Sequence, residues 1–232
     1  MFFPFYDSTY ILVLIGVIVS MMASAKLNAT YQRYSAVRSM CGLTGAEAAK
    51  RLLNSQGIYD VTIRRVPGSL TDHYDPRSKT VNLSDAVYGS TSIAAIGVAA
   101  HECGHAMQDA ADYSPLRIRA ALVPAANLGS QLAWPLILVG LLLGSGGSGL
   151  AFAGIVLFSL AVLFQLVTLP VEYNASHRAV TLLDSTGILA GQEVGQTRKV
   201  LNAAALTYVA AAAASILQLL RLLILFGNRR ND

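Results

Sequence analysis

One long stretch of the chain carries no charged side chain. From Ala120 to Val171 there is no Asp, Glu, Lys, Arg or His. About 20 apolar residues in a helix span a bilayer core, so this stretch is long enough for two spans joined by a turn. The segment GLLLGSGGSGL at 140–150 is typical of such a turn, because Gly and Ser favour a loop. The sequence therefore predicts a transmembrane hairpin over residues 120–170.

Two further apolar runs are long enough to cross a membrane. The first, residues 8–25, could instead be a cleaved signal peptide, but signal peptides start with a positive region and the only charge before this run is Asp7. An uncleaved anchor is therefore favoured. The last run, residues 200–226, contains Arg221, whose side chain can reach the interface, so this run either spans the membrane or lies along it. The expected fold is a mainly α integral membrane protein with three to four transmembrane helices.

Lys and Arg residues are distributed unevenly among the segments that connect these runs. Eleven lie in residues 26–119 and three in residues 171–199, whereas residues 1–25 and the turn at 144–149 contain none. Cytoplasmic segments carry an excess of Lys and Arg, so residues 26–119 and 171–199 are both expected to face the cytoplasm. This bias also accounts for the net charge of +4, and no nucleic-acid partner is expected.

Residues 26–119 are the segment that can form a compact domain outside the lipid. Helix caps, alternating apolar residues and a Pro-containing turn mark its elements. The expected order is a helix that begins with the capping box Thr44–Glu47 and ends at Gly57, a strand in 59–68, a hairpin in 70–84 with its turn at 75–78, and a helix capped by Ser90, Thr91 or Ser92 that ends near Ala111. These elements predict a small α+β domain.

The last of these helices carries the motif His101-Glu102-x-x-His105. At 100° per residue the two imidazoles lie one turn apart on one helix face, so both can bind one metal ion. Glu102 lies beside them, where it can accept a proton from metal-bound water rather than bind the metal. The alternative is a pair of ordinary core histidines, but this would also bury an unpaired carboxylate, which is costly. The motif predicts a zinc site with Glu102 as the catalytic base.

A catalytic zinc ion takes three protein ligands and keeps a fourth position open. Asp109 lies on the same helix as the histidines, and three ligands along one helix cannot converge on a tetrahedral ion. The remaining downstream acids are Glu172, Asp184 and Glu193. Glu172 is the first charge after the uncharged stretch, so it is favoured as the third zinc ligand. Ser176, one turn further on, is expected to steady one of the ligands.

Several segments together resemble one known family. They are YSAVRS, GLTGAEAAKRLL, LTDHYDPRSKTVNLS, SIAAIGVAAHECGHAMQDA and LPVEYNASHRA. They are similar to the bacterial membrane zinc metallopeptidases of the YugP type, also called putative neutral zinc metallopeptidases, over nearly the whole chain. The resemblance implies a zinc-dependent peptidase related to the membrane gluzincins, which use a downstream Glu as the third ligand. In that wider group an Asp follows this Glu four residues later. Here the position is Ser176, so the Asp role does not carry over.

Four other side chains are candidates for binding the substrate or stabilising the oxyanion of the reaction. His73 and Tyr74 lie in the predicted hairpin, whose edge could pair with an extended peptide. His177 and Arg178 follow the expected third ligand and could act on the oxyanion. Ordinary turn or surface packing is the alternative for all four. Cys103 and Gly104, inside the motif, are expected to be a packing residue and a point of close backbone approach.

The sequence favours a zinc endopeptidase anchored in the cell membrane by several spans, with its active site facing the cytoplasm. Its expected partners are a peptide or protein substrate, including membrane proteins, the lipid bilayer, and a second copy or another membrane protein. Two alternatives stay open: an intramembrane zinc protease with Asp184 as a ligand, and a non-catalytic zinc-stabilised membrane scaffold. The uncharged run before the motif, residues 86–100, is too short for a span, and a structural zinc site needs no Glu102.

Overall fold

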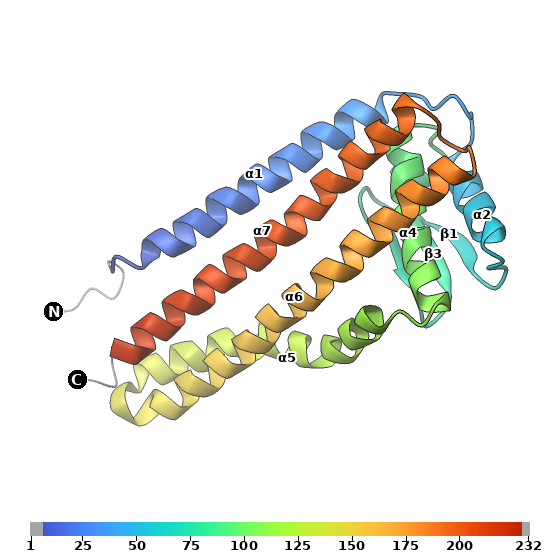
Figure 1. Ribbon diagram of the computed structural model, residues 1–232. Helices are drawn as coiled ribbons and strands as arrows, with labels where there is room; N and C mark the ends of the chain where they lie inside the picture. The colour runs from blue at the N-terminus through green and yellow to red at the C-terminus, as the bar shows by residue number, and fades with distance from the viewer. Residues whose placement is uncertain (1–6, 229–232) are drawn as a thin grey trace. The chain divides into compact units, whose positions relative to one another are not determined.

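The computed structural model describes residues 7–228, apart from the side chains of Ser145 and Asn228. The chain is mainly helical and includes one small sheet (Figure 1). It divides into two compact units, which within the described chain comprise residues 7–23, 117–169 and 207–228, and residues 24–116 and 170–206. We call the first the helical unit and the second the motif unit. Helices α1 (Tyr10–Ser35), α6 (Ser148–Ser185) and α7 (Gln192–Asn228) contribute residues to both units.

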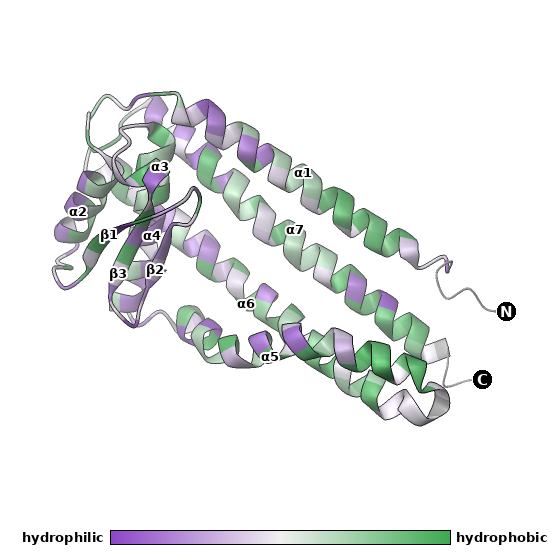
Figure 2. Ribbon diagram, turned by 180° about the vertical axis from the view of Figure 1, so that it is seen from behind, coloured by the Kyte–Doolittle hydropathy of each residue, from purple (hydrophilic) through white to green (hydrophobic). Residues whose placement is uncertain are grey.

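Within residues 7–228, four helices are long and apolar enough to cross a membrane, namely α1, α5 (Ser114–Leu142), α6 and α7. Figure 2 shows long hydrophobic stretches along these helices. The expected hairpin is present, since α5 ends at Leu142, the short 3-10 helix η1 (Gly144–Gly147) makes the turn, and α6 follows. Helix α7 is continuous and meets the length and composition of a span. The number of candidate spans therefore lies at the upper end of the three to four predicted.

Close contacts join the helices of the helical unit at small residues. A Cβ atom built on Gly129 of α5 would lie 2.5 Å from the carbonyl oxygen of Leu157 in α6, so only Gly fits there. A polar contact links α7 to the start of α1. Arg221 of α7 lies 3.4 Å from the Asp7 carboxylate and stacks over the Tyr10 ring, 4.0 Å from the ring centre. The Arg221 charge, expected to reach the interface, thus meets an acid and an aromatic ring at the start of α1.

The sheet of the motif unit has the strand order β1-β3-β2. Strand β1 (Thr62–Val66) runs parallel to β3 (Thr80–Ser84), and β2 (His73–Asp75) runs antiparallel to β3. Every residue of the central strand β3 is buried. In the turn the Asp75 carboxylate accepts hydrogen bonds from the amide of Arg77 and the hydroxyl of Ser78. The predicted strand and hairpin are both confirmed, and β2 forms an edge of the sheet.

The predicted helices of this unit are also confirmed. Helix α2 (Gly45–Ser55) begins with the expected capping box between Thr44 and Glu47. Helix α4 (Ile93–Ala110) is capped by Ser92, whose side chain accepts a hydrogen bond from the Ala95 amide. The sequence did not predict the short helix α3 (Asp85–Tyr88). The apolar faces of α2, α4 and β3 form one core with the end of α6 and the start of α7.

Helix α6 extends well past the predicted end of its span. The hairpin was expected to end at Pro170 and to be followed by a separate segment over 171–199, but Pro170 lies inside α6 and the helix continues to Ser185. Proline removes one backbone hydrogen bond from a helix. Apolar residues spaced one turn apart offset this loss, because Val171, Ala175, Ala179 and Leu183 are fully buried.

Candidate metal site

A glycine lets α6 approach the motif helix closely. A Cβ atom built on Gly104 would lie 2.5 Å from the carbonyl oxygen of Ala175, a distance that real Cβ atoms do not adopt. Close backbone approach was the expected role of Gly104 and is confirmed. Because Ser176 follows Ala175 directly and Glu172 precedes it by about one helical turn, this approach brings both side chains to the histidines of α4.

His101, His105 and Glu172 form a group whose ligand atoms all lie within 4.8 Å of one another. The Nε2 atoms of His101 and His105 lie 3.2 and 3.6 Å from Oε2 of Glu172. In a tetrahedral zinc site with bonds of about 2.0–2.1 Å, two ligand atoms are about 3.3 Å apart. Both the donor types and the spacing therefore fit one zinc ion. Among residues 7–228 this is the one such group of His, Cys, Asp and Glu side chains.

Gln108 fixes the protonation of His105. Its amide nitrogen donates to the carbonyl of Val171 at 2.8 Å and to Oδ1 of Asn174 at 3.0 Å, which uses both amide hydrogens. Its oxygen faces Nδ1 of His105 at 3.0 Å and therefore accepts a hydrogen bond from that nitrogen. With the proton on Nδ1, the Nε2 lone pair of His105 points to the metal position.

Ser176 holds the other imidazole. Its hydroxyl lies 3.0 Å from Nδ1 of His101, while Nε2 of the same ring faces Glu172. Ser176 and Glu172 are one helical turn apart on α6, so one helix supplies both a candidate ligand atom and the hydrogen-bond partner of a second candidate ligand. This contact is compatible with the expected role of Ser176 in steadying a ligand, and that role stays a prediction.

Arg178 extends the network around Gln108. Its Nε donates to Oδ1 of Asn174 at 2.8 Å, and its guanidinium lies 6.0 Å from the centre of the Tyr113 ring. These contacts tie Arg178 to the amide that steadies Gln108. His177 is exposed and lines a neighbouring pocket of ≈ 390 Å³ with Tyr173 and Ser176. A role for His177 or Arg178 toward the substrate stays a prediction.

Glu102 is buried beside the two histidines, with 7% of its surface exposed. Within residues 7–228 its carboxylate has no hydrogen-bond partner, in contrast to Glu172. A carboxylate that is close to the metal position and has no other partner is free to accept a proton. This arrangement fits the predicted role of a base rather than a ligand.

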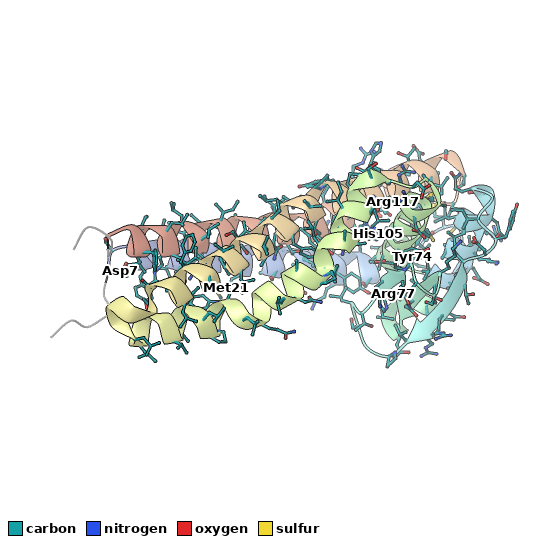
Figure 3. The ribbon with its side chains drawn as sticks, turned by 90° about the horizontal axis from the view of Figure 1, so that it is seen from below. Asp7, Met21, Tyr74, Arg77, His105 and Arg117 are labelled. Atoms are coloured by element: carbon teal, nitrogen blue, oxygen red, sulfur yellow. The ribbon has the colours of Figure 1, made fainter. Side chains whose placement is uncertain are left out.

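The hairpin reaches α4 through Tyr74, and Figure 3 shows Tyr74 and His105 in the motif unit. The Tyr74 hydroxyl donates to Oδ2 of Asp109 at 2.8 Å, and Asp109 lies one turn beyond His105. Burial, together with the Asp109 charge, raises the pKa of Tyr74 well above its usual value, so the phenol stays protonated.

His73, in the same hairpin, contacts the Thr71 carbonyl and the Asn82 side chain. Substrate roles for His73 and Tyr74 also stay predictions.

Burial and neighbouring charges shift the pKa values of two more side chains on α4, His105 and Cys103. Burial lowers the pKa of His105, but the Glu172 carboxylate, 3.6 Å from its Nε2, and the charge of Glu102 favour the protonated ring and outweigh this effect, so the net shift in the pKa is upward when no metal is bound. Burial raises the pKa of the Cys103 thiol far above its usual value, and the Glu102 charge adds to this. Cys103 is thus a packing residue, as expected, and not a reactive thiolate.

The other two downstream acids lie outside this group. Asp184 is exposed and three helical turns beyond Glu172 on α6. Glu193 accepts a hydrogen bond from the Met40 amide at 2.7 Å.

The sequence analysis did not predict the roles of Gln108 and Asn174 beside the candidate ligands. The signal was present for Gln108, because it follows the apolar residues Ala106 and Met107 one turn after His105, and a buried amide needs partners.

Comparison with known proteins agrees with this geometry. The family described as "Putative neutral zinc metallopeptidase" matches residues 9–227. The protein named "Putative membrane protease YugP" from Bacillus subtilis (strain 168) is 48% identical over 214 residues, which cover 92% of this chain and 94% of the relative. No solved structure matches the chain. From the extent of both matches, the chain belongs to the family of putative neutral zinc metallopeptidases.

Proposed function

We propose that the protein is a zinc-dependent endopeptidase anchored in the cell membrane, with its active site facing the cytoplasm. The observation that carries this proposal is the convergence of two histidines and a carboxylate from separate helices, with Glu102 beside them and unpartnered among the described residues. The family description and the membrane protease name of the relative support the same class of activity.

The site residues divide the chemistry among them. His101, His105 and Glu172 would hold Zn²⁺, which when bound polarises a carbonyl and makes a water molecule more acidic. Glu102 accepts a proton from the attacking water and later delivers it to the leaving amine. Gln108 and Ser176 hold the imidazoles so that both Nε2 atoms face the same point. Each residue thus has a role that another cannot fill.

The orientation is proposed from charge. Residues 26–119 and 171–199 carry most of the Lys and Arg, and the excess of these residues marks cytoplasmic segments. Both segments supply parts of the same compact unit, which is consistent with their facing the same side.

An intramembrane protease with Asp184 as a ligand is less well supported. Asp184 is exposed and outside the ligand group, and α4 is not among the four helices with the length and composition of a span. A non-catalytic scaffold would also leave the buried Glu102 without a purpose, since burying a carboxylate is costly.

The test compares Glu102→Gln with Asp184→Asn in the purified full-length protein. We expect each variant to bind about one zinc per chain, and Glu102→Gln to lose metal-dependent cleavage of a peptide library by about 100-fold or more. Asp184→Asn should cleave as the parent does. Zinc loss in Glu102→Gln, or cleavage that survives this change, would contradict the proposed role of Glu102.

A second comparison addresses the third ligand. We expect Glu172→Gln to lower zinc content strongly, because a neutral amide replaces the anionic ligand, and Asp184→Asn to leave zinc content unchanged. Metal analysis after dialysis against a weak chelator measures both. Equal zinc content in the two variants would remove Glu172 from the ligand set.

A further inference from the structure

A second pocket in the motif unit lies apart from the metal ligands. It has a volume of ≈ 690 Å³ and is lined by residues of α1, α6 and α7. Three of the lining residues are cations: Lys26 and Arg33 on α1, and Lys199 on α7. No Asp or Glu lines the pocket, and within residues 7–228 none of these cations forms an ion pair. The pocket is therefore strongly positive and has no acid of its own to neutralise it.

Helical spacing gathers the lining side chains on two facing stripes. On α1 the lining residues recur at 26, 29, 30 and 33, and on α7 at 199, 202, 203 and 206. Positions three and four apart share a helix face, so each helix presents one continuous stripe to the pocket. Each stripe combines cations or hydrogen-bonding side chains with apolar ones, such as Ala29 and Leu206. The pocket can therefore hold a molecule with an anionic end and an apolar end.

The apolar runs of three helices end at this pocket. Lys26 is the first charge after the run of α1, and Lys199 is the last charge before the long uncharged part of α7. Tyr173 of α6 comes two residues after the uncharged stretch ends at Val171, and half of its surface is exposed. Tyr and basic residues concentrate where a span meets the lipid headgroups. If these helices cross the bilayer as in the proposed function, the pocket lies at headgroup level.

We propose that this pocket binds the phosphate headgroup of an anionic phospholipid. Lys26, Arg33 and Lys199 would surround the phosphate, and the side-chain amide of Asn202 would donate a neutral hydrogen bond. Basic pockets between transmembrane helices at the cytoplasmic side are suited to such headgroups. The small residues Ala29 and Ala203 leave room for the glycerol and the first acyl carbons. The proposal rests on the membrane topology but not on the peptidase activity.

A bound lipid would contact the same helix that carries the third metal ligand. Glu172 and Tyr173 are adjacent on α6, so their side chains point about 100° apart, one to the metal group and the other to the pocket. A lipid seated between α1, α6 and α7 would hold α6 at the level of Glu172.

The first test measures lipid binding by native mass spectrometry of the full-length, zinc-loaded protein. Phosphatidylglycerol and phosphatidylcholine are added after delipidation. We expect the parent to bind phosphatidylglycerol in preference to phosphatidylcholine. In the variant Lys26→Gln/Arg33→Gln/Lys199→Gln, the affinity for phosphatidylglycerol should fall by about tenfold or more. The control Lys50→Gln/Arg51→Gln/Arg64→Gln removes the same charge from exposed positions outside the pocket and should bind as the parent does. Equal losses in both variants, or no lipid preference in the parent, would overturn the proposal.

Two tryptophan variants test whether the lipid binds in the pocket itself or is only attracted by the positive charge of this region. Ala29→Trp fills the pocket, whereas Asn28→Trp adds the same side chain at the next, exposed position, which does not line it. We expect at least a tenfold loss of phosphatidylglycerol binding in Ala29→Trp alone. Binding that is unchanged in Ala29→Trp would refute the site.

Soluble glycerol phosphate distinguishes a lipid site from a site for free phosphate. We expect it to displace phosphatidylglycerol only weakly, because it lacks the acyl chains that the apolar wall would contact. Tight binding of glycerol phosphate without binding of the lipid would overturn the lipid assignment. Zinc content, measured in parallel, should stay unchanged in all variants. A failure of the peptidase assay would therefore be distinct from a failure of lipid binding.

Discussion

At the scale of single residues, the candidate site depends on side chains that would not touch the metal. Gln108 is fully buried and uses its oxygen and both amide hydrogens, so it can take only one orientation. That orientation places the proton of His105 on Nδ1 and leaves Nε2 for zinc. The nitrogen of His105 that is available to a metal ion is therefore determined by Gln108, one helical turn away.

Replacing Gln108 should weaken zinc binding without removing a ligand. Gln108→Met has a similar volume but leaves Nδ1 of His105 and the Val171 carbonyl without their partners. We expect zinc affinity to fall about 10–100-fold. Competition with a chromophoric chelator measures this affinity. Gln32→Met, at an exposed position of α1, is the control and should bind zinc as the parent does. Unchanged affinity in Gln108→Met would show that His105 does not need this amide.

Gly104 should be intolerant of any side chain. Gly104→Ala places a methyl group against the Ala175 carbonyl, so α6 must move away and carry Glu172 with it. We expect lower zinc affinity and a loss of stability of about 1–3 kcal/mol. Gly195→Ala, on α7 with open space around it, should cost nothing or stabilise slightly. Thermal unfolding and metal analysis of both variants provide the comparison.

Part of this site can be predicted from the sequence because its signals are local. His101, Glu102 and His105 share one helical turn, and Glu172 is marked by its place after the uncharged stretch. The partners of the imidazoles are harder to assign. Asn174 meets Gln108 only because α6 packs against α4, and a contact between residues 66 positions apart leaves no local pattern.

At the scale of elements, the central feature is that α6 is one helix with two roles. Its first part has the composition of a span, and its last four turns pack into the motif unit. The predicted span ends at residue 170 because the uncharged stretch ends at Val171, and the proline at position 170 would also disfavour a continuous helix. Tertiary packing of the apolar residues beyond it outweighs that local preference. Short helices with strong caps, such as α2, were predictable because the cap is encoded in four adjacent residues.

The capping box of α2 should contribute measurably to the stability of the protein. Thr44→Ala removes the side chain that accepts from the Glu47 amide, and we expect a loss of about 0.5–2 kcal/mol in the free energy of unfolding. Glu47→Gln preserves the capping-box pattern, because an amide oxygen can still accept from the Thr44 amide, so its effect should be smaller. Chemical denaturation followed by circular dichroism measures both. A larger loss in Glu47→Gln than in Thr44→Ala would contradict this assignment.

At the scale of the whole molecule, the proposed topology makes opposite predictions for two connecting segments. A reporter fused after Asp60 should behave as cytoplasmic, and one inserted at Gly147, between α5 and α6, as external. The physical reason is the concentration of Lys and Arg around the first site and their absence from the turn at 144–149. If both reporters indicate the same side, the segment between them does not cross the membrane an odd number of times.

The motif unit is assembled from two parts of the chain, residues 24–116 and 170–206, and the candidate ligands come from both. His101 and His105 belong to the first part and Glu172 to the second, so a zinc ion would bind the two parts to each other. A ligand that binds only the folded state stabilises it by about 3–4 kcal/mol when its free concentration is 100–1,000 times Kd. Chelation should therefore lower the midpoint of thermal unfolding of the parent and increase hydrogen exchange in α6 after Glu172. Glu172→Gln, already poor in zinc, should unfold near the midpoint of the chelated parent and respond little to chelator. If the parent loses its zinc and keeps both its midpoint and its exchange protection, then packing alone joins the two parts.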